Sequence, residues 1–339
     1  MQFDVIPFFF AFALTLILTL FALKFFPYLN LVDRPEKYGL KRKPIPYYGG
    51  LTIFFSFVIA TLIFLPLSRE VLGLLLGASL LTIVSFFDDY RGLPVIFRLL
   101  IQVLSASILV FSGIGITEIS NPFGGVLSLE VFWLAEIFTI VWIVVITNAV
   151  NWLDGVPGLS PGVGTLAALV IFFLAVRPDF HFFDQSAVIT LAAIIVGCAL
   201  AFTIFNFPPP RILFGDTGSI LLGFVLAALA IFSGGKIATA VLVLGLPILD
   251  FGFVIVRRIL SKRSPLQGDL SHLHHRFLAA GLSKCQTVLI FYLIAGLFGL
   301  SAIFIPHTFG KLVAFLVLLS GFWVLVFLLR NYRKLERES

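Results

Sequence analysis

The chain has 339 residues, of which 60% are hydrophobic and 12% are charged, and its formal net charge is +6 at pH 7. So few charged residues exclude a water-exposed domain of ordinary size. The two cysteines, Cys198 and Cys285, are too few for a disulfide framework or a thiolate metal site. The composition favours a single integral-membrane domain over residues 1–339.

Apolar segments follow one another along the chain, each near the length of about 20 residues that crosses a hydrocarbon core. The predicted spans are 5–26, 49–66, 71–87, 95–112, 131–147, 160–176, 186–205, 218–233, 237–256, 286–305 and 311–330. We therefore predict an all-α fold, a polytopic transmembrane helical bundle of about 11 helices. The first span follows no basic region and precedes no cleavage site, so it is expected to remain as a helix.

The connections between the predicted spans differ in charge. Alternate connections and the C-terminus hold 19 of the 23 Lys and Arg residues, and the opposite side holds Arg69, Arg177, Lys236 and Lys311. Because cytoplasmic loops carry the basic excess, we expect the N-terminus outside and the C-terminus in the cytoplasm. The positive charge is thus interpreted as an orientation signal with some affinity for lipid headgroups and phosphates, and no nucleic acid partner is expected.

The side chains best suited to chemistry lie on the expected cytoplasmic side. In chain order they are Lys41-Arg42-Lys43, Asp88-Asp89, Asn148-Ala-Val-Asn151 with Asp154-Gly155, Asn206 ahead of Gly215-Asp216-Thr-Gly218-Ser219, and Asp269-Leu-Ser-His272-Leu-His274-His275-Arg276. The acids of the other side are single residues in loops without polar neighbours. Function is therefore expected at the cytoplasmic face.

Each cluster also has a structural interpretation. Asp88 and Asp89 end a span, where a carboxylate costs less than the roughly 2.5 to 3.5 kcal/mol of a charge at mid-bilayer. Asn148 and Asn151 are three residues apart and could join two helices. Asp216 could be the N-cap of the eighth helix, and the histidines could form a solvated surface. No cluster is specific by itself.

The clusters taken together predict a reaction class. Gly155 and Gly158 are expected to break the fifth helix, and an unwound segment at membrane depth is tolerated where it lines a cavity or is buried in protein. Carboxylates and carboxamides are the oxygen ligands that Mg²⁺ uses together with substrate phosphates. Basic and histidine neighbours suit a diphosphate. We therefore predict metal-assisted phosphoryl chemistry at the membrane surface.

Five motifs occur in a fixed order within residues 33–276. They are Pro44-Ile-Pro46-x-x-Gly49-Gly50; Asp88-Asp89; Asn148-x-x-Asn151-x-x-Asp154-Gly155-x-x-Gly158-Leu159; Asn206-Phe-x-Pro with Phe214-Gly215-Asp216-x-Gly218-Ser219; and His272-x-His274-His275. This order resembles the polyprenyl-phosphate N-acetylhexosamine-1-phosphate transferases. The His-Leu-His-His-Arg sequence and the eleven spans are more similar to the transferases that start O-antigen, enterobacterial common antigen or teichoic acid synthesis than to phospho-MurNAc-pentapeptide translocase.

The resemblance implies a reaction and its partners. A sugar-1-phosphate, with GlcNAc-1-phosphate favoured, would pass from a UDP-sugar to undecaprenyl phosphate or a similar polyprenyl phosphate in the lipid bilayer, releasing UMP. The implied cofactor is Mg²⁺, with Mn²⁺ able to substitute. The implied location is the bacterial inner (plasma) membrane, as a multi-pass protein with its active site facing the cytoplasm. The oligomeric state stays open between a monomer and a homodimer.

The resemblance also implies residue roles. Asp88 and Asp89 would be catalytic, with Asp88 as base or phosphate organiser, and Asn151 and Asp216 would bind the metal. The implied substrate-binding residues are Lys41, Arg42, Lys43, Arg98, Asn148, Asp154, Gly155, Asn206, His272, His274, His275 and Arg276. Among them, Arg98 would steer the lipid phosphate, Asp154 and Asn206 would bind the nucleotide, and the 272–276 loop would grip diphosphate or sugar.

Two residues depart from the family pattern. Pro157 stands where the family usually has an Asp linked to the nucleobase, and Leu213 stands where it has a Phe that stacks on uracil. Phe214 follows one residue later. The mode of uracil recognition therefore stays open.

Two alternative functions remain. One is phospho-MurNAc-pentapeptide transfer within the same family, and the other is secondary transport. Coupling residues of a transporter lie near the bilayer midplane, where the predicted spans contain only Asp250 and Glu136. For Asp250 we expect a buried ion pair or a hydrogen bond, since Arg257 lies two turns later on roughly the same face.

Overall fold

The structure is a computed structural model that describes residues 4–38, 42–129, 131, 133–177, 185–232, 237–262, 264 and 272–338. Lys41 lies outside the described residues. The elements are α1 (Ile6–Phe25), η1 (Pro35–Tyr38), α2 (Gly50–Phe64), α3 (Arg69–Arg91), α4 (Val95–Phe111), β1 (Glu118–Ser120), β2 (Val126–Ser128), α5 (Leu134–Trp152), η2 (Leu153–Gly155), α6 (Leu159–Val176), α7 (Ser186–Asn206), α8 (Gly215–Phe232), α9 (Ile237–Val243), α10 (Gly245–Leu260), α11 (Leu273–Ala279), α12 (Lys284–Phe304) and α13 (Thr308–Glu338).

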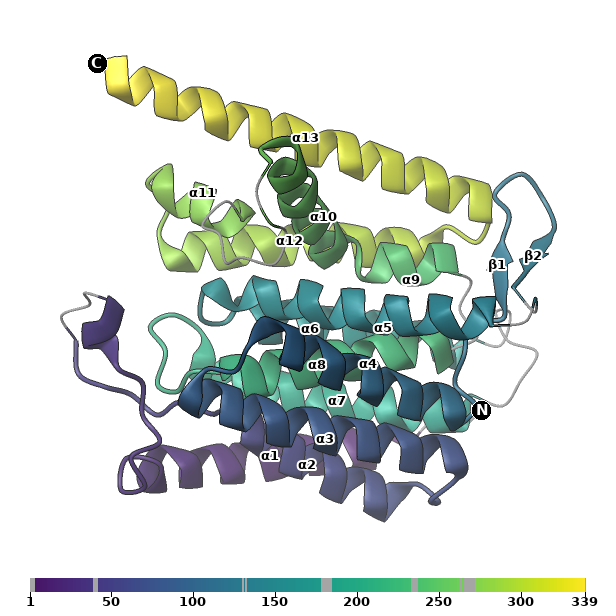
Figure 1. Ribbon diagram of the computed structural model, residues 1–339, viewed down its shortest axis with the longest axis horizontal. Coiled ribbons are helices and arrows are strands. Elements are labelled where there is room, and N and C mark those ends of the chain that lie inside the picture. The colour runs from purple at the N-terminus through teal and green to yellow at the C-terminus, as the bar shows by residue number, and fades with distance from the viewer. Residues whose placement is uncertain are drawn as a thin grey trace.

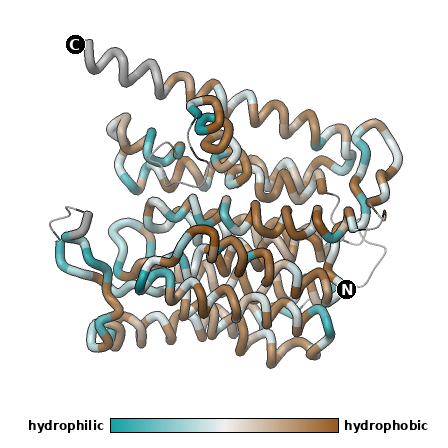
Figure 2. The backbone as a smooth tube through the Cα atoms, in the orientation of Figure 1, coloured by the Kyte–Doolittle hydropathy of each residue, from teal (hydrophilic) through white to brown (hydrophobic). Residues whose placement is uncertain are grey.

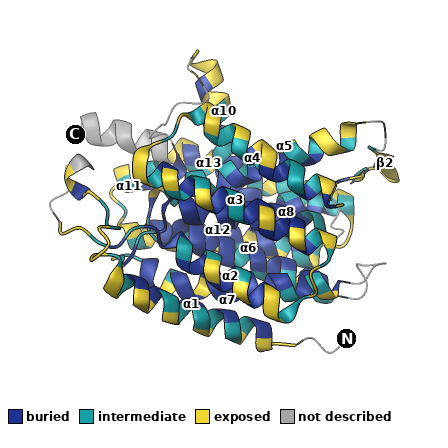
Figure 3. Cartoon of the chain, turned by 60° about the horizontal axis from the view of Figure 1, so that its bottom comes forward, coloured by how far each residue is buried: buried dark blue, intermediate teal, exposed yellow. Residues whose placement is uncertain are grey.

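The long helices lie side by side with their axes roughly aligned (Figure 1). Helices α6, α7 and α8 occupy the buried middle of the bundle (Figure 3). Helix α8 is apolar on all sides, as expected of a helix surrounded by protein, and Leu221, Leu222 and Phe224 on it are fully buried. Peripheral helices such as α1 and α13 instead expose large apolar residues, among them Phe9 and Phe327. These exposed apolar faces suit contact with lipid.

Each predicted span coincides with helix, but the number of crossings is less simple than predicted. Within the described residues, eight helices are long and apolar enough to cross a membrane, and the count is nine if the bent pair α9–α10 forms one span. Helices α2 and α4, which correspond to two further predicted spans, have 15 and 17 residues. The protein is thus a helical polytopic membrane protein.

The predicted span over 237–256 is divided into two helices. Helices α9 and α10 meet at Leu244 with a bend of 83°. Pro247 has no N–H to donate to the carbonyl four residues earlier, so the hydrogen-bond ladder is interrupted where the chain bends. As a result, α10 projects from the body of the bundle (Figures 1 and 3).

Two elements were not predicted. Strands β1 and β2 form an antiparallel hairpin between α4 and α5, so the protein is not purely α-helical. Helix α11 lies in the connection between α10 and α12 and carries the histidine motif. Both elements are shorter than the windows that reveal membrane spans.

The two ends of the bundle differ in polarity. At one end, α1 is connected to α2, α3 to α4, α5 to α6, and α7 to α8. Hydrophilic segments gather at this end (left in Figure 2), which we call the polar end. The hairpin and the N-terminus lie at the opposite end, well apart from each other, whereas the C-terminus lies at the polar end (Figure 1).

Candidate active site

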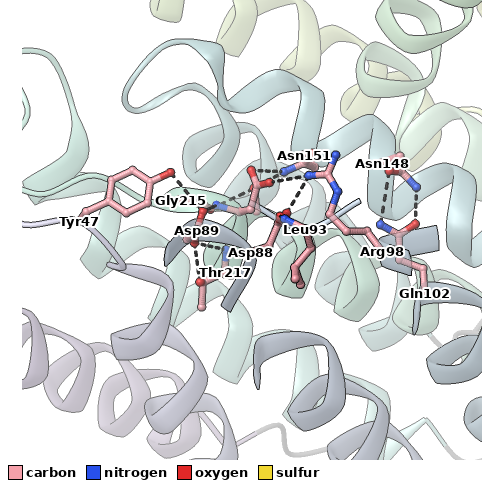
Figure 4. Close-up of polar contacts among 12 residues, drawn as sticks. Tyr47, Asp88, Asp89, Leu93, Arg98, Gln102, Asn148, Asn151, Gly215 and Thr217 are labelled. Carbon is pink, nitrogen blue, oxygen red and sulfur yellow. Dashed lines mark hydrogen bonds and ion pairs between the residues drawn. The ribbon is translucent and has the colours of Figure 1, made fainter. Parts of the chain in front are cut away.

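Four helices bring charged and amide side chains together at the polar end. Asp88 and Asp89 lie near the end of α3, Arg98 lies in the first turn of α4, Asn151 lies near the end of α5, and Asp216 lies in the first turn of α8 (Figure 4). Because these helices start or stop at the same end of the bundle, residues up to 128 positions apart in the sequence become neighbours.

Arg98 joins two carboxylates. Its Nη1 atom donates to Asp88 Oδ2 at 2.7 Å and to Asp216 Oδ2 at 3.2 Å. The other Asp88 oxygen, Oδ1, accepts a hydrogen bond from the backbone N–H of Leu93 at 2.6 Å. The structure thus brings the side chains of Asp88, Arg98 and Asp216 together, and it leaves the Arg98 side chain partly exposed.

Asn151 is tied to the start of α8. Its Nδ2 atom donates to Asp216 Oδ1 at 2.9 Å and to Ser219 Oγ at 2.9 Å. Asp216 is therefore contacted from two helices, by Arg98 on α4 and by Asn151 on α5. The two residues predicted to bind metal are direct neighbours.

Asp89 makes different contacts from Asp88. Its oxygens accept the backbone N–H groups of Asp216 at 3.1 Å and Thr217 at 3.0 Å, and its Oδ2 accepts the Thr217 hydroxyl at 2.6 Å. It thereby satisfies the free N–H groups that begin α8 and lies favourably at the positive end of the helix dipole. The N-cap function considered for Asp216 is supplied by Asp89 instead.

Tyr47 completes the environment of Asp89. Its phenol hydroxyl donates to Asp89 Oδ1 at 3.2 Å. Burial, and next the nearby Asp89 carboxylate, raise the pKa of Tyr47, so the phenol stays protonated and keeps this hydrogen bond. Gly215, which has a φ of +75°, leaves space for both groups, since a Cβ atom there would lie 2.9 Å from Asp89 Oδ2.

The proline-glycine motif anchors α2 against α8. Leu213 N–H donates to the Pro46 carbonyl at 2.9 Å, and Gly50 N–H donates to the Phe214 carbonyl at 3.0 Å. A Cβ atom at Gly50 would lie 2.2 Å from the backbone nitrogen of Gly218. Only a glycine allows the two helix starts to approach this closely, and that approach fixes the position of Asp216.

Asn148 lines a cavity next to the charged cluster. Its Nδ2 donates to Gln102 Oε1 at 2.5 Å, and Gln102 Nε2 donates back to Asn148 Oδ1 at 3.4 Å. The two amides lie on the wall of a mostly apolar groove of about 160 Å³ that Arg98 and Asn151 also line. The groove is bordered by α4, α5, α8 and α10, and it adjoins the charged cluster at Arg98 and Asn151.

The predicted helix break after Asn151 is confirmed. Helix α5 ends in the short helix η2, and α6 starts after Gly158, which has a φ of +84°. The Asp154 carboxylate lies in this break, near those of Asp89 and Asp216. Asn206 supports the break, because its Oδ1 accepts Gly158 N–H at 2.6 Å.

Asn206 is 1% exposed, and its Nδ2 donates to the carbonyl of Ile212 at 2.7 Å. Its contacts therefore hold two loops together. The nucleotide-binding role implied by the resemblance stays a prediction for this residue.

The histidine loop packs against the same break. A Cβ atom at Gly155 would lie 2.2 Å from His274 Nε2, so the absence of a side chain at Gly155 makes room for the ring. His274 is fully buried, neither ring nitrogen has a hydrogen-bond partner among the residues that the structure describes, and burial lowers its pKa to about 3. The imidazole is therefore neutral near pH 7 and fits a contact with a neutral polar group better than a charge pair.

The neighbours of His274 complete this loop. His272 Nδ1 is hydrogen-bonded to Asp250 Oδ2 at 2.8 Å. His275 lies with its ring centroid 4.2 Å from that of His274. The Arg276 guanidinium lies over the Phe253 ring, 4.6 Å from its centroid. Asp250 thus has the predicted hydrogen-bonding role, but its partner is His272.

The basic cluster of the first polar connection is engaged locally. Arg42 forms an ion pair with Asp33 and donates to the Lys43 carbonyl at 3.1 Å. Lys43 is exposed. These contacts place Arg42 within its own loop, and a substrate contact by Arg42 or Lys43 stays a prediction.

Phe214 does not replace the aromatic ring missing at Leu213. It is 1% exposed and packs against Phe202 with a ring-centroid distance of 5.0 Å. Its side chain therefore belongs to the core. Pro157 and Leu213 are partly buried, and the way the base is recognised stays open.

The residues present fit a magnesium ion that shares its ligands with a substrate. Among the described residues, no group of three His, Cys, Asp or Glu side chains forms a complete metal site. Asp216 and Asn151 nevertheless offer a carboxylate and an amide side by side. Mg²⁺ commonly takes one or two protein ligands and fills its other positions with phosphate oxygens and water.

Sequence reasoning missed several supporting residues. Tyr47 lies inside the proline-glycine motif at a variable position, so the motif gave no reason to select it. Gln102 did carry a signal, because it is a polar residue in an apolar span, one helical turn after Arg98. Thr217 and Asp250 required knowledge of which helices meet.

Comparison with known proteins identifies the family and several relatives. The model of glycosyl transferase family 4 matches residues 71–234. The chain is 33% identical over 279 residues to a "Probable undecaprenyl-phosphate N-acetylglucosaminyl 1-phosphate transferase" of Bacillus subtilis, covering 80% of this chain and 76% of the relative. It is 30% identical over 340 residues to a decaprenyl-phosphate N-acetylglucosaminephosphotransferase of Mycobacterium leprae, covering 89% and 85%.

A relative with a different donor is also similar. A phospho-N-acetylmuramoyl-pentapeptide-transferase of Halalkalibacterium halodurans is 30% identical over 281 residues, covering 78% of this chain and 84% of the relative. The relatives therefore agree on the class of reaction and differ in the sugar that their names state.

Proposed function

Because the chain belongs to glycosyl transferase family 4, we propose that it transfers GlcNAc-1-phosphate from UDP-GlcNAc to a polyprenyl phosphate such as undecaprenyl phosphate. The observation that carries this proposal is the joined set of Asp88, Arg98, Asp216 and Asn151 where four helices meet. Relatives whose names state GlcNAc transfer support the choice of donor.

The acceptor enters from the lipid side. The groove beside Arg98 is mostly apolar and suits the first isoprene units, while the partly exposed guanidinium suits the phosphate. A phosphomonoester has a second pKa of about 6 and is largely ionised at neutral pH. Asp88 then holds Arg98 in place and orients the phosphate, and no strong base is required.

The donor occupies the water-facing side of the cluster. Asp216 and Asn151 would hold Mg²⁺, which neutralises charge on the donor diphosphate. The acceptor phosphate oxygen attacks the phosphorus that carries the sugar, and the bond from that phosphorus to the bridging oxygen breaks. UMP leaves with that oxygen, and a diphosphate links sugar to lipid. Since phosphoryl transfer depends mainly on positioning and charge neutralisation, the task of Asp89 is to fix the start of α8.

The site is proposed to face the cytoplasm of a bacterial inner membrane. The polar end has the basic excess that marks cytoplasmic loops, and UDP-sugars are made in that compartment. Chain ends at opposite ends of the bundle support an odd number of spans (Figure 1). Eleven is reached when the short helices α2 and α4 also cross.

One assay tests the reaction. Purified protein is supplied with Mg²⁺, undecaprenyl phosphate and, in separate reactions, radiolabelled UDP-GlcNAc and UDP-MurNAc-pentapeptide. Labelled lipid and equimolar UMP from UDP-GlcNAc are expected, and both should disappear with EDTA. Product from the pentapeptide donor alone would reassign the sugar, and no lipid product from either donor would reject the function.

A further inference from the structure

Asp250 is a buried acid that the transfer mechanism above does not use. It lies on α10, six residues after the break at Leu244, and it is 1% exposed. A charged group in such a position requires specific partners, because an unpaired buried charge is costly. We propose that Asp250 is a positioning residue that holds His272 in the orientation needed for donor binding and transfer. This inference rests on the proposed function.

Both Asp250 oxygens point to the start of α11. Oδ2 is 2.8 Å from His272 Nδ1, and Oδ1 accepts the backbone N–H of Leu273 at 2.8 Å. The second bond caps the first turn of a helix of seven residues. One carboxylate thus fixes both the backbone and the ring at the beginning of the histidine loop.

The bond to the ring determines the state of His272. A carboxylate that accepts from Nδ1–H selects the tautomer in which Nδ1 carries the proton. Among the described contacts, Nδ1 is the hydrogen-bonded nitrogen of this ring, which leaves Nε2 for a ligand. In the neutral ring Nε2 accepts a hydrogen bond, and in the protonated ring it donates one to a phosphate.

Aromatic packing places the held ring beside the proposed active site. The Trp152 ring, directly after Asn151, meets His272 edge-on at a centroid distance of 5.2 Å. Trp152 also packs against Phe251, the neighbour of Asp250, at a centroid distance of 4.5 Å. His272 is therefore fixed between the end of α5 and the projecting helix α10. A change in either hydrogen bond of Asp250 alters the position of His272 relative to Asn151.

Asp250→Asn is the direct test. Asparagine has nearly the same shape and can still accept the Leu273 N–H, but its amide no longer provides two acceptors. We expect kcat to fall about 10- to 100-fold, the range for losing a group that orients a functional histidine, with little change in the KM for polyprenyl phosphate. Arg257→Gln is the matched control on the same helix, because Arg257 is exposed, and it should behave as wild type.

A double-mutant cycle separates positioning from general stability. If Asp250 acts through His272, Asp250→Asn combined with His272→Ala should be no slower than His272→Ala alone. A loss of turnover in the double variant equal to the product of the two single losses would overturn the proposal. So would a His272→Ala protein with wild-type turnover.

A spectroscopic test does not depend on the folding of the Asp250 variant. Nitrogen-15 NMR of the histidine-labelled wild-type protein, with His272 assigned by its loss in His272→Ala, should show Nδ1 protonated. A ring protonated at Nε2 alone would refute the geometry. Wild-type protein without transferase activity but with a protonated Nδ1 would instead reject the proposed function and leave the contact standing.

Discussion

Two adjacent aspartates, Asp88 and Asp89, follow each other in the sequence but contact different partners. Asp88 holds the Arg98 guanidinium, whereas Asp89 accepts the N–H groups that begin α8. On a helix, neighbouring residues point about 100° apart, so consecutive residues seldom act on the same atoms. The pair therefore combines one residue suited to contact a phosphate with one that fixes the position of Asp216.

Asp216 and Asn151 provide the clearest test at the scale of single residues. We expect Asp216→Ala and Asn151→Ala each to reduce turnover at least about a hundredfold, as for removal of one electrostatic contact to a transition state. The melting temperature should change little for Asp216→Ala, because Asp89 supplies the cap of α8. Radiolabelled lipid formation and thermal unfolding in detergent measure the two effects, and near-normal turnover in a folded Asp216→Ala protein would reject the metal role.

The effects of substitutions at Gly155 and His274 on the free energy of unfolding should be strongly coupled. Gly155→Ala places a Cβ atom 2.2 Å from His274 Nε2, and such overpacking typically costs about 1 to 3 kcal/mol. Adding His274→Ala removes the ring and should restore part of the lost stability, so the two effects should not be additive. Unfolding free energies of both single variants and the double variant provide the measurement, and strict additivity would contradict the contact.

His274 should also make the folded protein sensitive to acid. Its folded-state pKa is about 3, below the ordinary value of 6.5, because the ring is buried, with Asp250, His272 and His275 as its charged or titratable neighbours. Below pH 6.5 the unfolded chain binds a proton that the folded chain excludes. Stability should therefore fall by about 1.4 kcal/mol per pH unit from pH 6.5 towards pH 3 and be constant above. His274→Asn should reduce the loss of melting temperature between pH 7 and pH 5, and an equal loss in both proteins would contradict it.

At the scale of elements, the existence of the long helices was predictable, and the contacts between helices were not. Apolar runs of about 20 residues located all the long helices, because the bilayer imposes that length. Apart from Pro247, the same runs gave no sign of the 83° bend. They also did not show which helix ends meet. Arg98 was assigned to the site through the resemblance, and the structure brings it to Asp88. The Asp250–His272 bond joins a span to a loop whose path no local pattern determines.

The close contact of α2 with α8 supplies a prediction about elements. Gly50→Ala would bring a Cβ atom 2.2 Å from the backbone nitrogen of Gly218, and backbone cannot move as a flexible side chain can. We expect α2 to be displaced, with a loss of both melting temperature and turnover. Gly296→Ala on α12 is the control, because a Cβ atom there meets nothing within 4 Å and alanine favours the helix. Equal behaviour of the two variants would show that the helix starts are not in contact.

At the scale of the whole molecule, the chemistry depends on which side of the membrane the polar end faces. The 19-to-4 asymmetry of basic residues predicts the cytoplasm, where UDP-sugars are present. The hairpin then lies outside, and its Phe123 side chain is 82% exposed. Ala279, at the end of α11, is exposed in the connection between α10 and α12.

Cysteine labelling tests this orientation. In a background with Cys198→Ala and Cys285→Ser, Phe123→Cys should react with a membrane-impermeant maleimide on intact cells, because the reagent reaches the outer face. Ala279→Cys should react only after the membrane is permeabilised. Both variants should retain transferase activity, since neither position lies in the charged cluster. Labelling of Ala279→Cys but not of Phe123→Cys on intact cells would reverse the topology and place the site away from its nucleotide-sugar donor.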